Sequence, residues 1–254
     1  MDAGSGSGGR QNESDQDVDP GDVASISAAH ALVVDRIARA CQRASRAPDD
    51  VQLIAVSKTV PPERLRAAVA SGLRVLGENR VQEAVAKAGS VPGAIWHLIG
   101  PLQSNKARRA VETFASIETV ESVDLAKRLD RLAGELRPGD PLPVLLQVNV
   151  DDDPAKAGFA PAEIGPILGE ILSLRNLRVD GLMTVGSFVR EPEAARPTFT
   201  ALRRLSDVLR HDHPSLGRQL SMGMSDDFEI AIEEGATMVR VGRALFGARP
   251  GGPV

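Results

Sequence analysis

The chain has 254 residues, of which 42% are hydrophobic and 25% charged, a composition typical of a folded globular protein. A formal net charge of −4 argues against a nucleic-acid-binding protein, and the single cysteine, Cys41, excludes an intrachain disulfide. No apolar run reaches the ~18 residues of a membrane span, and the N-terminus lacks a secretory signal pattern. We therefore expect a cytoplasmic protein without nucleic-acid or membrane partners.

Residues 1–20 are rich in Gly, Ser, Asp and Gln and nearly lack apolar side chains. Such a segment cannot bury enough surface to offset the entropy of ordering it, so the composition predicts a disordered tail. Residues 21–254 are expected to form one domain that begins with a helix over residues 24–44.

Eight short, apolar and largely β-branched segments then alternate with helical patterns. The predicted strands are residues 51–56, 73–76, 95–99, 116–120, 144–150, 179–185, 219–222 and 238–241. Strands separated by helices pair in parallel, and apolar strands of this kind are covered on both faces. Eight such repeats favour a single (β/α)8 TIM barrel, with a doubly wound open sheet as the alternative. We expect the first helix to pack across the bottom of this barrel.

Lys58 is the strongest candidate for chemistry because it directly follows the first predicted strand, where barrels place their active sites. An amine at that position is partly desolvated, which lowers its pKa and makes it a usable Schiff-base nucleophile. An ion pair with a carboxylate such as Glu78 is the alternative. The other lysines are expected on polar helix faces, near a helix start or in a loop. They are Lys87, Lys106, Lys127 and Lys156.

The segments after the last two strands suggest a phosphate site. Residues 223–225, Gly-Met-Ser, lead into a helix expected from Asp226, and Gly242 follows the eighth strand. Glycines let backbone N–H groups approach an anion, and Ser225 can supply a hydroxyl. Asp226 and Asp227 would oppose a phosphate, so we expect them to face away. Taken singly, these residues are also typical of ordinary turns.

Three further features have competing interpretations. His97 alternates with apolar neighbours, so it is either a hydrogen-bonded core residue or part of the site. Trp96 points the opposite way and is expected to pack in the core. Residues 151–153 are three aspartates that diverge in direction and have no His or Cys beside them, which favours a solvated loop over a metal site.

Several motifs in this chain resemble those of the pyridoxal phosphate homeostasis proteins, whose barrel is similar to the alanine racemase N-terminal domain, fold type III. The similarity runs from about residue 25 to 250, in order and with consistent spacing. The motifs are residues 55–59, 77–79, 96–97, 99–106, 221–227, 238–242 and 246–247.

The resemblance implies that pyridoxal 5′-phosphate (PLP) is the cofactor, bound covalently to Lys58. Ser225, Gly242 and the backbone of residue 243 would hold its phosphate, Arg240 would face the pyridine nitrogen, and Asn79 would lie near the ring. The residues expected to bind the cofactor are Lys58, Asn79, His97, Gly223, Met224, Ser225, Arg240, Gly242 and Arg243.

Two departures from the family pattern affect this site. Arg80 stands where the family commonly has tyrosine, and Arg243 stands where it often has serine or threonine. The second change puts a hydroxyl contact to the phosphate in doubt, so phosphate affinity could change in either direction.

The resemblance also favours a carrier of PLP over an enzyme. An arginine at the ring nitrogen does not give up its proton, so it weakens the electron sink that stabilises carbanions. Alanine racemases need a second, β-rich domain that supplies a tyrosine, whereas this chain ends soon after Gly242 and contains no tyrosine. We expect a non-catalytic protein, a monomer or weak dimer, that buffers PLP and hands it to apoenzymes.

Two enzymatic alternatives remain open. One is a PLP-dependent amino-acid racemase or lyase that uses Lys58 with His97 or a water molecule as partner. The other is a barrel isomerase or aldolase without PLP, in which Lys58 forms a Schiff base with a phosphorylated sugar.

Overall fold

A computed structural model describes residues 18–187 and 189–247 of the chain. Most of the predicted disordered tail, residues 1–17, lies outside the described residues. Its last three residues are ordered: Val18 packs against the core, and helix α1 (Pro20–Arg43) begins at Pro20. The Asp19 side chain caps this helix by accepting the Gly21 N–H at 2.8 Å, which satisfies a backbone donor that has no partner within the helix.

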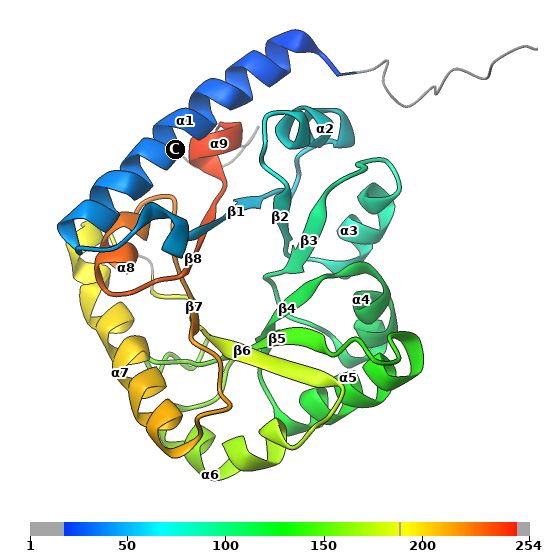
Figure 1. Cartoon of the computed structure of the whole chain (residues 1–254), viewed down its shortest axis with the longest axis vertical. Helices are drawn as coiled ribbons and strands as arrows, with labels where there is room; N and C mark the ends of the chain where they lie inside the picture. Colours follow the sequence, from blue (N-terminus) through cyan, green and yellow to red (C-terminus); the bar gives the residue numbers. More distant parts are fainter. Residues whose placement is uncertain (1–17, 188, 248–254) are drawn as a thin grey trace, which may run out of the picture.

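Eight parallel strands close into a barrel in chain order, with β8 hydrogen-bonded to β1, so the predicted TIM barrel is confirmed (Figure 1). The strands are β1 (Gln52–Val56), β2 (Val75–Glu78), β3 (Ile95–Leu98), β4 (Ser116–Val120), β5 (Leu142–Gln147), β6 (Leu177–Met183), β7 (Gln219–Met224) and β8 (Met238–Val241).

Helices follow the strands and ring the outside of the barrel (Figure 1). They are α2 (Pro62–Ala70), α3 (Val81–Ala88), α4 (Ala107–Thr113), α5 (Val123–Leu136), α6 (Pro161–Leu172), α7 (Arg196–Asp212), α8 (Phe228–Glu233) and α9 (Arg243–Phe246). Within the described residues, short 3-10 helices lie in the connections: η2 (Pro48–Asp50), η3 (Ser104–Lys106) and η4 (Pro192–Ala195).

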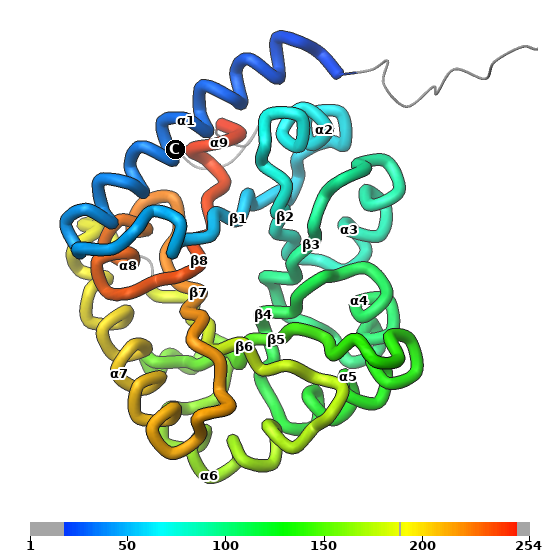
Figure 2. Tube along the Cα trace, in the orientation of Figure 1, coloured from blue at the N-terminus to red at the C-terminus, as the bar shows by residue number. Residues whose placement is uncertain are grey.

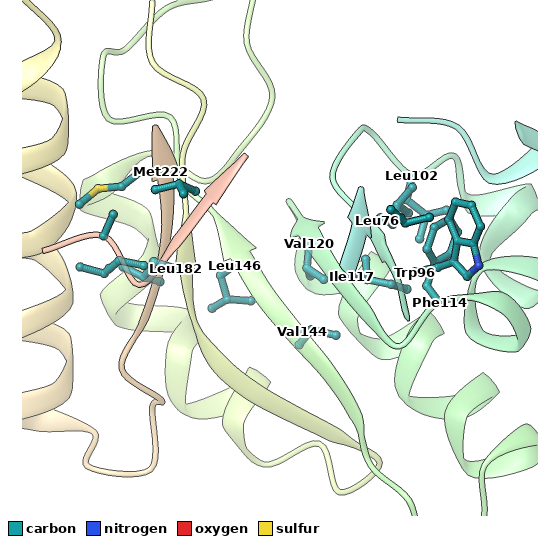
Figure 3. Packing of buried hydrophobic residues seen from close by; sticks show 14 of the residues in the cluster. Leu76, Trp96, Leu102, Phe114, Ile117, Val120, Val144, Leu146, Leu182 and Met222 are labelled. Carbon is teal, nitrogen blue, oxygen red and sulfur yellow. The ribbon is translucent and has the colours of Figure 1, made fainter. Parts of the chain in front are cut away.

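The core has two parts because successive strand side chains point to opposite faces. The larger part lies between the strands and the surrounding helices, and Figure 3 shows Trp96 among its apolar neighbours, as the alternation in β3 predicted. The smaller part is made only by strand residues and the chain that follows them, so it fills the barrel interior. Its buried members are Ile54, Ile99, Leu145, Met183 and Met238.

Helix α1 does not cross the bottom of the barrel, so that prediction is wrong. It runs along the outer wall against α2, α8 and α9 (Figure 2). Its buried residues, among them Ile26, Val33, Ile37 and Cys41, form one stripe at helical spacing. Helices α8 and α9 are only six and four residues long, so α1 covers the wall that a longer eighth helix would cover. Among the described residues, no helix has the length and apolarity that crossing a membrane requires.

Candidate functional site

Lys58 lies in a tight turn at the carboxyl end of β1. The turn is closed by the Val60 N–H, which donates to the Ser57 carbonyl oxygen at 3.0 Å. Thr59 within it has a φ of +64°, a left-handed conformation that a β-branched residue adopts only under strain. Lys58 is half-buried and, together with Gly242 and Arg243, lines a cavity of about 320 Å³.

The turn after β7 meets the end of β8, as the predicted phosphate site requires. The Gly242 backbone N–H donates to the Ser225 Oγ at 3.2 Å. Because the Ser225 hydroxyl is the acceptor in that bond, its own hydrogen can still be donated to another group. The Arg243 guanidinium forms an exposed ion pair with Asp226, which holds this cation at the edge of the same loop.

Gly223 and Asp227 shape this turn. Gly223 has a φ of +89°, and a Cβ added there would lie 2.5 Å from the Cβ of Ala231, so the turn packs too closely on α8 for any side chain. Asp227 is buried and accepts the Met224 N–H at 2.6 Å. Burial raises the pKa of the Asp227 carboxyl, against the lowering effect of this bond. The Met224 N–H is therefore engaged within the loop.

A hydrogen-bonded network crosses the barrel interior below this rim. Glu118 of β4 is fully buried, and its Oε1 lies 2.8 Å from the Nδ1 of His97 on β3. Its Oε2 accepts the hydroxyl of Ser221 on β7 at 2.6 Å. Arg240 of β8 donates to the Ser221 Oγ at 2.6 Å and to the Thr184 carbonyl oxygen at 2.8 Å. Two predicted site residues, His97 and Arg240, are thus linked through Ser221, which begins one of the family motifs, and Glu118, which the sequence analysis did not single out.

Arg240 is a buried cation that needs compensating charge. Burial lowers the pKa of its guanidinium, and the nearby carboxylates of Glu118 and Asp227 act in the opposite direction. A buried charge costs several kcal/mol unless it is paired and hydrogen-bonded. The interior carboxylates therefore make it possible for a cation to occupy this position.

Lys87 is placed differently from its predicted position on a polar helix face. Its side chain is only 12% exposed, and its Nζ donates to Glu78 Oε1 at 2.7 Å and to the Ser57 carbonyl oxygen at 3.0 Å. The Ser57 hydroxyl also lies 2.9 Å from the same carboxylate oxygen. The Glu78 carboxylate, proposed as an alternative partner for Lys58, is thus bound to Lys87 and Ser57.

Asn79 lies at a second cavity, of about 750 Å³, rather than at the one that Lys58 lines. The other residues that line this cavity include Arg80, Gln103 and Lys106. Arg80, one of the two departures from the family pattern, is largely exposed at its rim. The structure thus brings Lys58, Gly242 and Arg243 to one cavity and Asn79 to another.

The prediction that residues 151–153 form a solvated loop is wrong for Asp151, whose side chain is largely buried. Its Oδ2 accepts the backbone N–H and hydroxyl of Ser187 and the Lys156 ammonium, and its Oδ1 accepts the Thr198 hydroxyl at 2.6 Å. Burial alone would raise the pKa of Asp151, but these hydrogen bonds outweigh it and lower the pKa. Asp151 therefore ties the loop after β5 to the segment after β6 and to α7.

Comparison with known proteins agrees with this architecture. The family model described as the alanine racemase N-terminal domain matches residues 33–250. The pyridoxal phosphate homeostasis protein of Pseudomonas aeruginosa is 45% identical over 224 residues, which span 86% of this chain and 94% of that protein.

Solved structures give the same result. PipY of Synechococcus elongatus PCC7942, a structure with PLP bound, is 43% identical with a TM-score of 0.74, and the match covers 85% of this chain and 100% of PipY. Alanine racemase of Clostridium difficile 630 is 14% identical with a TM-score of 0.70, which shows a shared fold alone. That match covers 89% of this chain and 57% of the racemase chain.

A closed parallel barrel with a lysine at the end of β1 and a Gly-Met-Ser turn beside the end of β8 defines an alanine racemase-type barrel protein. Within that class, the chain belongs to the pyridoxal phosphate homeostasis protein family. The family expected from the sequence motifs is confirmed.

Proposed function

We propose that this protein binds PLP covalently through Lys58 and acts as an intracellular carrier and buffer of the cofactor. The observation that carries the proposal is the cavity that Lys58, Gly242 and Arg243 line together. A family member with PLP bound, PipY, supports the identity of the ligand. The cavity fits such a ligand because its lining combines the Lys58 amine with the Arg243 guanidinium, a cation that can attract an anion.

PLP, when bound, supplies an aldehyde carbon that condenses with an amine to give a C=N bond and release water. Lys58 provides the amine in this proposal, and the turn at Thr59 fixes the backbone from which its side chain extends. The bond is reversible by exchange with another amine, which is the property that a carrier requires.

The phosphate is assigned to the corner between β7 and β8. The Ser225 hydroxyl, held by the Gly242 N–H, keeps one hydrogen to donate to an anion, and the Arg243 guanidinium lies at the rim of the cavity. In this proposal Gly223 does not contact the phosphate through a side chain, and its role is to let the turn pack closely on α8. The Met224 N–H is engaged by Asp227, so Met224 contributes through the shape of the turn.

Arg240 is assigned to the pyridine nitrogen. Its bonds to Ser221 and Thr184 use two of its five N–H groups, which leaves donors for a ring acceptor. A guanidinium does not give up its proton, so the ring nitrogen facing it stays unprotonated. This arrangement holds the cofactor while weakening its ability to stabilise a carbanion. Together with the absence of any tyrosine in the sequence, it favours storage over catalysis.

The cofactor and its lysine are tested by reduction. Purified protein is incubated with PLP, treated with borohydride, digested and analysed by mass spectrometry, beside the variants Lys58→Ala and Lys127→Ala. Lys127 is the matched control because it is exposed and paired with Glu170 on the barrel exterior. We expect a reduced pyridoxyl adduct on the peptide with Lys58, lost only in Lys58→Ala. An adduct formed only with a phosphorylated sugar would overturn the proposal in favour of a sugar isomerase or aldolase.

The carrier role is tested by transfer. PLP-loaded protein is mixed with an apo PLP-dependent enzyme, and recovery of that enzyme's activity is compared with recovery in an equal concentration of free PLP. We expect the loaded protein to restore activity while its own bound PLP decreases. Exchange of the α-proton of free amino acids, abolished by Lys58→Ala, would instead identify a racemase or lyase.

A further inference from the structure

The interior network has a defined direction of proton donation. A carboxylate has only acceptor sites, so the His97 Nδ1 that faces Glu118 must carry a hydrogen. The Ser221 hydroxyl has one hydrogen, which it donates to Glu118 Oε2, so its lone pairs face Arg240. All three bonds therefore run toward Glu118, from His97 on one side and from Arg240 through Ser221 on the other.

Glu118 also lies on a strand that contributes none of the predicted cofactor-binding residues. It is fully buried on β4, while His97 and Arg240 lie on β3 and β8. A buried carboxylate is retained only where donors or cations satisfy it. The two oxygens of Glu118 are satisfied by groups on two different strands, which fixes those groups relative to one another.

We propose that Glu118 is a positioning residue that sets the tautomer of His97 and, through Ser221, the orientation of the Arg240 guanidinium at the PLP ring. The part that concerns PLP rests on the proposed function, whereas the part that concerns His97 does not. Without the negative charge of the carboxylate, the Ser221 hydroxyl is held less firmly in this direction, so the acceptor that orients Arg240 is less fixed. The ring would then be held by a less rigid cation.

The first test reads the tautomer directly in protein without PLP. The sequence has four histidines, so nitrogen NMR can resolve and assign His97 by its loss in His97→Asn. We expect the hydrogen on Nδ1 in the wild type and on Nε2 in Glu118→Gln. The Ser221 hydroxyl donates to the amide oxygen of the glutamine, so the amide N–H faces Nδ1 and donates to it. An unchanged tautomer in Glu118→Gln would overturn the proposal whether or not PLP binds.

The second test measures PLP release from loaded protein to an excess of an amine trap. In Glu118→Gln the amide oxygen still accepts the Ser221 hydroxyl but carries no charge. Replacing a charged acceptor with a neutral one predicts about tenfold faster release. Ser221→Ala should release PLP faster as well but keep the His97 tautomer, since it breaks only the Arg240 branch. The matched control is Glu170→Gln, the same change at a half-exposed carboxylate on the barrel exterior, which should alter neither readout.

The outcomes separate the two proposals. If the wild type forms no borohydride adduct at Lys58, the proposed function fails while the tautomer result still stands. If the adduct forms but Glu118→Gln and Ser221→Ala release PLP at the wild-type rate, the positioning role fails. Equal destabilisation of both variants with unchanged spectra and release would identify a purely structural network.

Discussion

The Nζ of Lys87 lies 2.7 Å from Glu78 Oε1, and this ion pair supports the strand end that carries Lys58. Lys87 also donates to the carbonyl oxygen of Ser57, the residue directly before Lys58. The pair thus connects α3, β2 and the turn after β1. Its charges are largely removed from water, since Glu78 is fully buried and Lys87 nearly so.

Replacing Lys87 with methionine should destabilise the protein by about 3 kcal/mol, because it leaves a buried carboxylate without its cation. Burial already raises the pKa of Glu78, opposed by Lys87, so the variant raises that pKa further. Because the pKa of Glu78 in the folded protein lies above its ordinary value of 4.5, the folded state binds the proton more tightly than the unfolded chain does. The variant is therefore most stable below pH 4.5, and it loses stability as the pH rises and the buried carboxyl must ionise. The loss of unfolding free energy relative to the wild type should therefore be larger at pH 8 than at pH 4, and urea unfolding at the two pH values measures it.

Lys127→Met is the matched control for this prediction. Lys127 forms a pair of similar length with Glu170, 2.6 Å, but both side chains are about half exposed. Exposed pairs contribute roughly 0–1 kcal/mol, so the control should unfold close to the wild type at either pH. Equal losses in both variants would contradict the role given to burial.

The left-handed Thr59 predicts an unusual stabilising substitution. A β-branched residue at positive φ costs about 1–2 kcal/mol, whereas asparagine tolerates this region. Thr59→Asn should therefore raise the free energy of unfolding by about 1 kcal/mol. Thr59→Val keeps the branch and replaces only the hydroxyl with a methyl group, so it should show no such gain. A gain in both variants would mean that the hydroxyl, rather than the backbone, is the source of the strain.

Much of the fold could be predicted because it depends on periodicity. The alternation of apolar strands with punctuated helices predicted the eight-stranded barrel, although several strand boundaries shifted by two residues. The second strand was expected at residues 73–76 and lies at Val75–Glu78. Its last residues, a glycine and a buried glutamate, are not typical of a strand. They are accommodated by contacts with Ile99 and Lys87, which lie in other segments and are not visible in the local sequence.

The site residues that the sequence analysis missed are those whose role depends on a distant partner. Glu118 stands between Ile117 and Thr119 in a strand that is buried throughout, and its alternation with Ile117 was a signal that it faces the interior. Nothing local, however, indicates that it meets Ser221, 103 residues away. The position of helix α1 was missed for the same reason. Its helical pattern could be read from the sequence, but its place beside α8 depends on the short lengths of α8 and α9.

Asp151→Asn should reduce the loss of unfolding free energy that the protein shows as the pH falls. The folded-state pKa of Asp151 lies below its ordinary value of 3.8, so its contribution is present above that pH and lost as the pH falls through the lower folded value. The variant should be less stable than the wild type at pH 6, by about 1 kcal/mol after allowance for partial exposure, and should converge with it near pH 2. Urea unfolding across this range measures the difference, and a constant offset at every pH would contradict the assignment.

Gly223→Ala should be among the most damaging single-methyl changes in the chain. The added Cβ would meet the Cβ of Ala231 at 2.5 Å and the Cα of Phe228 at 2.9 Å, at a φ of +89° that disfavours any side chain. Overpacking and the left-handed conformation together predict a loss of about 2–4 kcal/mol, with displacement of the turn that leads to Ser225. Gly89→Ala, with a φ of −67° and no atom within 4 Å of the new methyl, is the control. Thermal unfolding should show a large loss for the first variant and little change for the second; comparable effects would mean that close packing on α8 does not require glycine.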